Sequence, residues 1–149
     1  MRRFIQSGLT AAVVALTALF AASHHASAQG MPSPLVQEVL VKSMLVTLND
    51  AVAADNFTVL HAKISKPFRD QFPPEKLRAI FKDLIDKHAT FDVVVAKPVV
   101  TDADARIDEN GVLRLKGHFE TTPKQVKYAL GFIPSDGLWK LSAVSIDIE

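Results

Sequence analysis

The sequence predicts an α+β domain in which three N-terminal helices pack on a curved antiparallel sheet of about four strands. Three observations lead to this prediction. Up to His88, apolar residues recur every three to four positions, which is typical of amphipathic helices. Beyond His88 the period falls to two, as in strands with one buried face. Turn sequences divide this second part into short strands, so helices and strands occupy separate parts of the chain.

Length and composition exclude several classes of protein. The chain has 149 residues, a formal charge of +1, no cysteine and 48% hydrophobic residues, which suits one folded domain. A charge so close to zero gives no support for nucleic acid binding. The lack of cysteine excludes disulfides, thiolate metal sites, a cysteine nucleophile and a lipid-anchored N-terminus.

Residues 1–28 have the order of a secretory signal peptide. Arg2-Arg3 precede an uncharged run of 14 residues at 9–22, and small residues follow at 26–28, where signal peptidase reads them. The run is shorter than the roughly 20 residues of a membrane-spanning helix, although an uncleaved anchor is the alternative. We expect export, cleavage near Ala28 and a periplasmic or secreted protein without membrane attachment after cleavage.

Cleavage there would leave 121 residues with 15 basic and 16 acidic side chains. Residues 29–33 are expected to form a linker, and residues 34–149 a single domain. The first helix is expected at about 34–54, with Ser33 as N-cap and Pro34 as first helical residue. Its apolar face is predicted from positions that recur every four residues: Val36, Leu40, Met44, Leu48 and Val52, with Val39, Leu45 and Ala51 beside them.

Two further helices are expected before the sheet. Asp55-Asn56 ends the first helix and can cap a short second one, which must end before Pro67. A loop containing Phe68 and Phe72 is expected next. A third helix is predicted from Pro74 to about His88, because its apolar residues follow the i, i+3, i+4, i+7, i+8 pattern: Leu77, Ile80, Phe81, Leu84 and Ile85.

The β-branched and aromatic segment 91–95 is predicted to be the first strand, resuming at Val99-Val100 beyond Pro98. Asn110-Gly111 indicates a hairpin turn. The other strands and turns are expected as follows: strands at 113–119, 126–133 and 138–148, with turns at 122–124 and 134–137.

In the last strand, apolar residues occupy odd-numbered positions in the first half and even-numbered positions in the second, so regular alternation would place them on opposite faces. Trp139 and Leu141 share one parity, and Val144, Ile146 and Ile148 share the other. A bulge near Ser142-Ala143 would bring both sets to one face. The alternative is a strand buried on both faces, one of them by a second subunit.

Two features of the sequence are characteristic. One is the order of these elements, with an Asp55-Asn56-Phe57 turn after the first helix, and the other is the final hairpin. Its strands are Tyr128-Ala129-Leu130-Gly131-Phe132 and Asp136-Gly137-Leu138-Trp139-Lys140-Leu141. This arrangement resembles the nuclear transport factor 2-like (cystatin-like roll) superfamily over nearly all of 34–148. The resemblance implies a conical half-barrel whose helices close around a pocket. It also implies a homodimer through the outer face of the sheet. Superfamily members include isomerases, dehydratases and non-catalytic binding modules, so the fold does not specify the function.

Four residues are pocket candidates. Tyr128, the only tyrosine, lies on a central strand, and the resemblance implies that isomerases of this type use a tyrosine with carboxylates inside the cone. Phe119 and Trp139 fall on inner strand positions. His61 lies four residues after Phe57, which favours a core histidine, with a pocket acid or base as the alternative. No carboxylate is clearly directed inward, so no catalytic residue is assigned.

No metal or cofactor is expected. His61, His88 and His118 lack the i, i+3 or i, i+4 spacing of a helical metal site. The acidic segment 102–108 fails as a calcium loop, because Ile107 stands where an EF-hand needs glycine. Nucleotide-binding and serine-hydrolase motifs are absent from the sequence. We therefore expect a module that binds a small apolar ligand or a protein. The alternative is a small isomerase or lyase that uses Tyr128 with a histidine or carboxylate.

Overall fold

The computed structural model describes residues 30–149, and the expected signal peptide with its cleavage site lies outside these residues. The elements follow in this order: α1 (Pro34–Ala54), α2 (Thr58–Lys63), α3 (Lys66–Gln71), α4 (Pro74–Ile80), α5 (Lys82–Asp86), the 3-10 helix η1 (Asp92–Ala96), β1 (Val100–Ile107), β2 (Leu113–Phe119), β3 (Val126–Ser135) and β4 (Leu138–Ile148). Within residues 30–149, no helix has both the length and the apolar character needed to cross a membrane.

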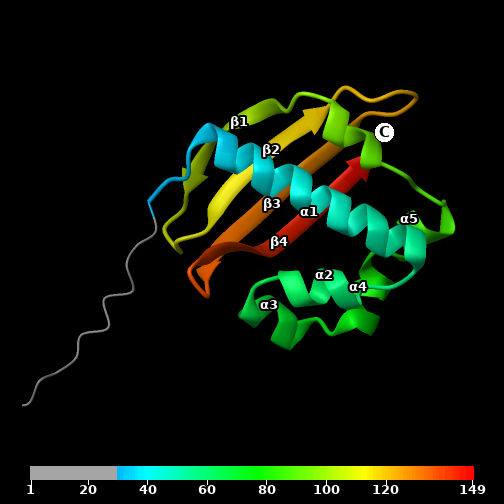
Figure 1. Cartoon of the computed structure of the whole chain (residues 1–149), viewed down its shortest axis with the longest axis horizontal. Helices are drawn as coiled ribbons and strands as arrows, with labels where there is room; N and C mark the ends of the chain where they lie inside the picture. Colours follow the sequence, from blue (N-terminus) through cyan, green and yellow to red (C-terminus); the bar gives the residue numbers. More distant parts are fainter. Residues whose placement is uncertain (1–29) are drawn as a thin grey trace, which may run out of the picture.

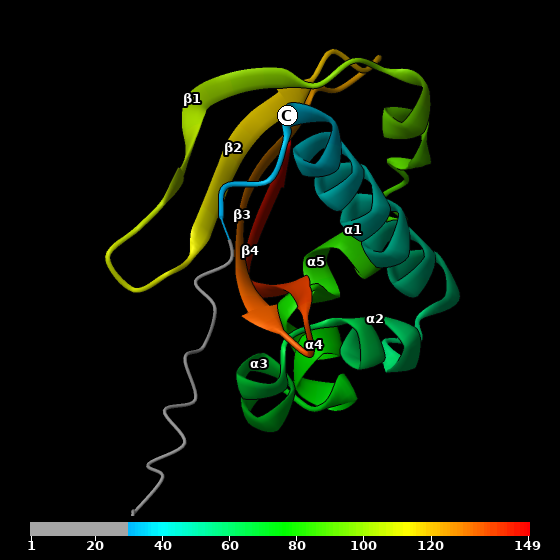
Figure 2. The same cartoon turned by 60° about the vertical axis from the view of Figure 1, so that its left-hand side comes forward.

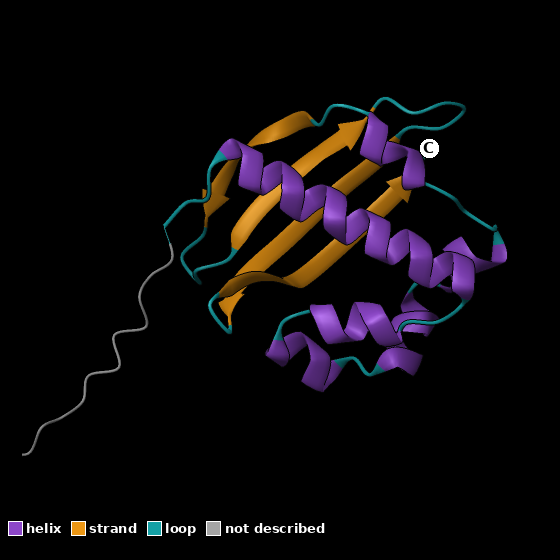
Figure 3. Cartoon of the chain, viewed as in Figure 1, coloured by secondary structure: helices purple, strands orange, loops and turns teal. Residues whose placement is uncertain are grey.

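The predicted α+β class with an antiparallel four-stranded sheet is confirmed. The strands form a meander in the order β1-β2-β3-β4, with every neighbouring pair antiparallel. Figure 2 shows the sheet curving around α1, which crosses one face of it. The short helices α2 to α4 lie near the β3–β4 turn in Figure 3. Ser65 connects them to the sheet, because its backbone N–H donates to the Leu141 carbonyl at 2.8 Å.

The predicted bounds of α1 are confirmed. The Ser33 side chain accepts from the Val36 N–H at 3.4 Å, and Asp55 closes the helix in the left-handed conformation with φ 48°. Part of the predicted apolar face is wrong, because Val36 and Val39 are exposed. Val39 lies about half a turn away from the buried face, and Val36 lies in the first turn, which is exposed. The buried face consists of Val41, Met44, Leu45, Leu48, Ala51 and Val52.

The helical part contains five α-helices rather than three. The expected loop around Phe68 is helix α3, in which Pro67 occupies the first turn, where its missing N–H costs nothing. The expected third helix is interrupted at Phe81, which has φ −96° and ψ 14°. The Phe81 ring is buried and stacks on Phe57 with centroids 5.8 Å apart. This contact accompanies the break between α4 and α5.

The predicted strand at 91–95 is wrong, because the segment forms η1 and the first strand begins only at Val100. The Phe91 backbone N–H donates to the buried Asn49 side chain of α1 at 2.8 Å, which fixes the start of the segment. Phe91 and Val94 are fully buried, and their spacing of three residues matches one turn of a 3-10 helix. Tertiary contacts with α1 therefore override the β propensity of the three valines.

Of the two alternatives for the last strand, the structure has the bulge. Gly131 pairs with Ala143 and Phe132 pairs with Leu141, which leaves Ser142 without a partner. The two apolar sets of β4 therefore share the inner face, and no second subunit is needed to explain the pattern. The β3–β4 turn is shorter than the expected turn at 134–137, because Ser135 still pairs with Leu138. It consists of Asp136 and Gly137, both with positive φ, as a two-residue type I′ turn requires.

Candidate functional site

One cavity lies between the α4–α5–η1 segment and the end of β4, and residues of the β2–β3 loop also line it. It has a volume of about 620 Å³, and we call it the β4 cavity. Its floor consists of inner-face side chains from two paired strands: Val126, Val144, Ile146 and Ile148. Phe81, Leu84 and Val93 face this floor from the helical side. The bulge at Ser142 makes the site possible, because it directs the second half of β4 inward.

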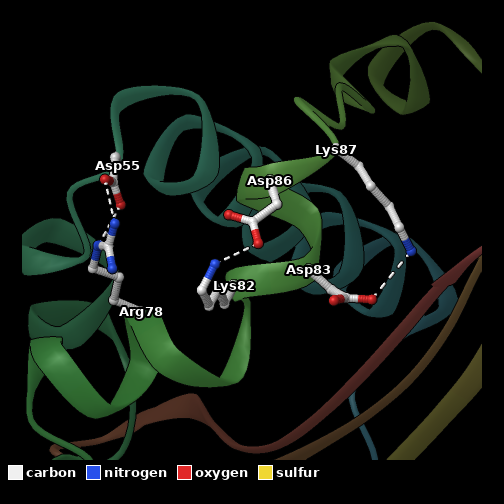
Figure 4. A network of polar contacts seen from close by, with 6 residues as sticks. All are labelled: Asp55, Arg78, Lys82, Asp83, Asp86 and Lys87. Carbon is white, nitrogen blue, oxygen red and sulfur yellow. Dashed lines mark hydrogen bonds and ion pairs between the residues drawn. The ribbon is translucent and has the colours of Figure 1, made fainter.

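Polar groups line the β4 cavity alongside its apolar floor. Asp83 and Lys87 form an ion pair at 3.1 Å, and both side chains are largely exposed. Figure 4 shows this pair one turn apart along the chain, beside the Lys82–Asp86 pair. Thr121, Thr122 and Lys124 of the β2–β3 loop also line the cavity. The cavity therefore has an apolar floor with polar groups around it.

A second cavity of about 200 Å³ lies between the first turns of α1 and strands β1 and β2. We call it the Tyr128 cavity. Tyr128 lines it and is only 4% exposed. Burial raises the pKa of Tyr128 to about 12, and the charges of Asp102 and Glu38 act in the same direction. The hydroxyl is therefore protonated at neutral pH, and within residues 30–149 no side chain or backbone group is hydrogen-bonded to it.

Glu38 lines the same small cavity as Tyr128. Its carboxylate forms an ion pair with Lys42 at 2.7 Å, one turn further along α1. Sequence reasoning did not place a carboxylate beside Tyr128. The signal was present, because Glu38 lies three residues before the buried Val41 and therefore on the same helix face.

The space for the Tyr128 ring depends on Gly117, its partner across the β2–β3 ladder. A Cβ at this position would lie 2.6 Å from the Tyr128 hydroxyl oxygen and 2.2 Å from the Val100 carbonyl oxygen. Phe119 supports the ring from the other side, with centroids 5.8 Å apart and a tilt of 42°. Phe119 is fully buried and contacts Tyr128 without lining the cavity.

His61 and Trp139 do not join Tyr128. His61 lies on α2, where its Nε2 atom is 3.3 Å from the Arg69 carbonyl oxygen of α3. Trp139 pairs with Pro134 near the β3–β4 turn and packs half-buried against the core. Neither residue lines the β4 cavity or the Tyr128 cavity. The structure therefore brings together only two of the four candidates, Tyr128 and Phe119.

In the part of the chain that the structure describes, no group of three or more histidine, aspartate or glutamate residues is arranged to hold a metal ion. His118 contacts two carboxylates that do not form such a group with it. Its Nδ1 atom lies 2.7 Å from Asp102 and its Nε2 atom 3.3 Å from Glu120. The contact with Asp102 joins the edge strand β1 to β2, and Glu120 directly follows β2.

Comparison with known proteins gives no match: no family model, no curated protein and no solved structure is significantly similar to this chain.

Proposed function

We propose that this protein is a non-catalytic binding module that holds a small, largely apolar ligand in the β4 cavity. The observation that carries the proposal is the apolar floor of a cavity of about 620 Å³. Ligand sites of proteins commonly have volumes of about 300–1,000 Å³ and apolar linings with a few polar groups. Each methylene that leaves water for such a floor contributes about 0.8 kcal/mol.

The ionisable groups of the β4 cavity favour binding over catalysis. General acid–base catalysis needs a positioned group within hydrogen-bond reach of the reacting atoms. Asp83 is paired with Lys87, and both side chains extend into solvent. Asp83 and Lys87 therefore contact each other in solvent, which favours binding over proton transfer at this pair.

The test is a binding titration with a neutral apolar fluorophore, N-phenyl-1-naphthylamine. We expect one molecule to bind per chain, and Ile146→Phe to weaken binding at least about tenfold by filling the cavity. Val39→Phe is the matched control, because Val39 is exposed on α1 and lines neither cavity. Absence of binding, or equal affinity in the Ile146→Phe variant, would contradict the proposal.

A second candidate function is proton transfer in the Tyr128 cavity, as in a small isomerase or lyase. It is favoured because the protonated Tyr128 and Glu38 line the same cavity, Tyr128 from the sheet and Glu38 from α1. Tyr128 would donate a hydrogen bond to a carbonyl oxygen, and Glu38 would accept a proton from the neighbouring carbon.

This second candidate predicts deuterium exchange at the carbon next to the carbonyl of cyclohexanone in D2O, followed by NMR. Tyr128→Phe and Glu38→Gln should each abolish the enzyme-dependent exchange. Exchange that persists in either variant, or that the wild type does not accelerate, would exclude this candidate.

Membership of the nuclear transport factor 2-like superfamily, with a conical half-barrel, is also proposed. The order of elements and the curvature of the sheet around α1 support it. We further propose export with cleavage after Ala28, on the order of residues 1–28. Intact-mass analysis of the exported protein should give a chain beginning at Gln29. A mass corresponding to the uncleaved chain would refute the cleavage.

A homodimer through the outer face of the sheet is a separate proposal. It is supported by small residues at the centre of that face, Ala129 and Ala143, and by flanking charges of both signs, Asp104 and Arg106. Light scattering after size exclusion should give twice the monomer mass, and Ala143→Arg should return the monomer. A monomeric wild type would refute the dimer.

A further inference from the structure

We infer that the ligand of the β4 cavity is a single-chain amphiphile with an anionic head, bound by its carboxylate at Lys124. This inference rests on the proposed function of the cavity and adds the chemical class of the ligand. In this arrangement the apolar chain lies along the floor of β4, and the head lies beneath the β2–β3 loop.

The length of the floor sets the length of the chain. Val144, Ile146 and Ile148 are successive inner positions of β4 and all line the cavity. At about 3.3 Å per strand residue they cover about 13 Å, which is the length of an extended chain of about ten carbons. A linear chain fits this shape, because a row of side chains on one strand presents an elongated surface.

The charged residues that line the β4 cavity indicate which head group the ligand has. Four charged residues line the cavity: Asp83, Lys87, Lys124 and Asp147. Asp83 and Lys87 neutralise each other as an ion pair at 3.1 Å. Asp147 lies opposite Lys127 on β3. The pKa of Lys127 is raised mainly by its hydrogen bond to Glu149, and the charge of Asp147 contributes to the same shift. Asp147 stands between the inner-face residues Ile146 and Ile148, so strand alternation places its side chain on the outer face of the sheet.

Lys124 differs from these residues. Lys124 has no carboxylate within ion-pair distance in residues 30–149. The same holds for Lys63, Lys76, Lys97 and Lys116, but of these five lysines only Lys124 lines the β4 cavity. The loop also holds its backbone, because the Thr121 hydroxyl donates to the Lys124 carbonyl oxygen. Thr122 and Thr90 line the same cavity. A lysine and two threonines in one cavity lining match a carboxylate in charge and in hydrogen-bonding capacity.

The experiment is calorimetric titration of the protein with three probes of equal chain length: decanoate, decanol and decyltrimethylammonium. We expect decanoate to bind about tenfold more tightly than decanol, and the cationic probe to bind most weakly. Lys124→Gln should reduce the affinity for decanoate to that for decanol and leave decanol unchanged. Lys76→Gln is the matched control, because Lys76 is exposed on α4 and lines neither cavity.

The outcomes separate the two proposals. If decanoate and decanol bind equally, or if the preference for decanoate survives Lys124→Gln, the head-group inference is overturned while the cavity remains a binding site. If none of the three probes binds, the proposed function itself fails. Loss of all binding in the Ile146→Phe variant would support the location of the chain on the β4 floor.

Discussion

The substitution Gly117→Ala tests the close approach between β1, β2 and the Tyr128 ring. The new methyl carbon would lie 2.2 Å from the Val100 carbonyl oxygen and 2.6 Å from the Tyr128 hydroxyl oxygen. Contacts of a real Cβ essentially never fall below 3.0 Å. The edge strand β1 must therefore move away from β2 by nearly 1 Å, or the local ladder must open.

The expected loss in the free energy of unfolding is about 3 kcal/mol, the upper end of typical overpacking costs, because one of the two obstacles is backbone. With a urea dependence of about 1.5 kcal/mol per molar, the unfolding midpoint should fall by about 2 M. Tyr128→Phe removes only the hydroxyl contact. In the Gly117→Ala background it should restore less than about 1 kcal/mol, since the carbonyl contact remains.

The assay is urea unfolding followed by the fluorescence of Trp139, the only tryptophan. Gly131→Ala is the control, because its Cβ would meet side-chain atoms of Ala143, Arg114 and Val112 at 3.1 Å. These atoms can shift slightly, so we expect a cost below about 1 kcal/mol. Equal midpoints for Gly117→Ala and Gly131→Ala would refute the reasoning.

Three further predictions concern single residues. Asn49→Ala should lower the free energy of unfolding by about 1–3 kcal/mol, because the buried Phe91 N–H loses its acceptor; a change below about 0.5 kcal/mol in urea unfolding would contradict this. The hydrogen bond from Arg78 lowers the pKa of Asp55, so this pair should lose its contribution to stability as the pH falls below the ordinary aspartate range. In thermal melts, Asp55→Asn should reduce the fall in melting temperature at acid pH. A pH dependence equal to that of the wild type would contradict this prediction. Tyr128 should titrate near pH 12 in the native protein by absorbance at 295 nm, but near pH 10 in urea. Because the unfolded state then loses its proton first, native stability should fall as the pH rises from about 10 to 12, and a native midpoint near 10 would contradict the burial of the hydroxyl.

The elements that the sequence predicts well are those whose signals are local. Ser33, Pro34 and Asp55 mark the ends of α1 within a few residues of the chain. Gly137 marks the last hairpin in the same way. The bulge at Ser142 was also predictable, because the two apolar parities of β4 conflict unless one residue is inserted between them.

The elements that sequence reasoning misses depend on distant partners. The segment 91–95 has strong β propensity, but its conformation is set by Asn49, 42 residues earlier in the chain. The break at Phe81 accompanies stacking on Phe57 from another helix. Pro67 predicts the end of one helix, but proline is equally favoured in the first turn of the next helix, which is the position it takes in α3.

In the candidate site, too, residues with local sequence signals could be predicted, whereas those that depend on distant partners could not. Tyr128 was predictable as an inward residue from strand alternation, and Phe119 from the same rule. The β4 cavity was not, because it combines the segment from Phe81 to Val93 with β4 and the β2–β3 loop. No local sequence pattern shows that these three regions meet. The role proposed for Lys124 depends on its having no ion pair, and ion pairs between side chains can be identified only in the folded structure.

The most direct test of the binding function is a two-dimensional amide NMR titration of the isotope-labelled protein with decanoate. Binding in the β4 cavity predicts saturable shift changes at Val93, Thr122 and Val144 to Ile148, with no change at Gln37 and Thr101 of the Tyr128 cavity. Changes centred on Gln37 and Thr101, or no saturable change at all, would contradict it.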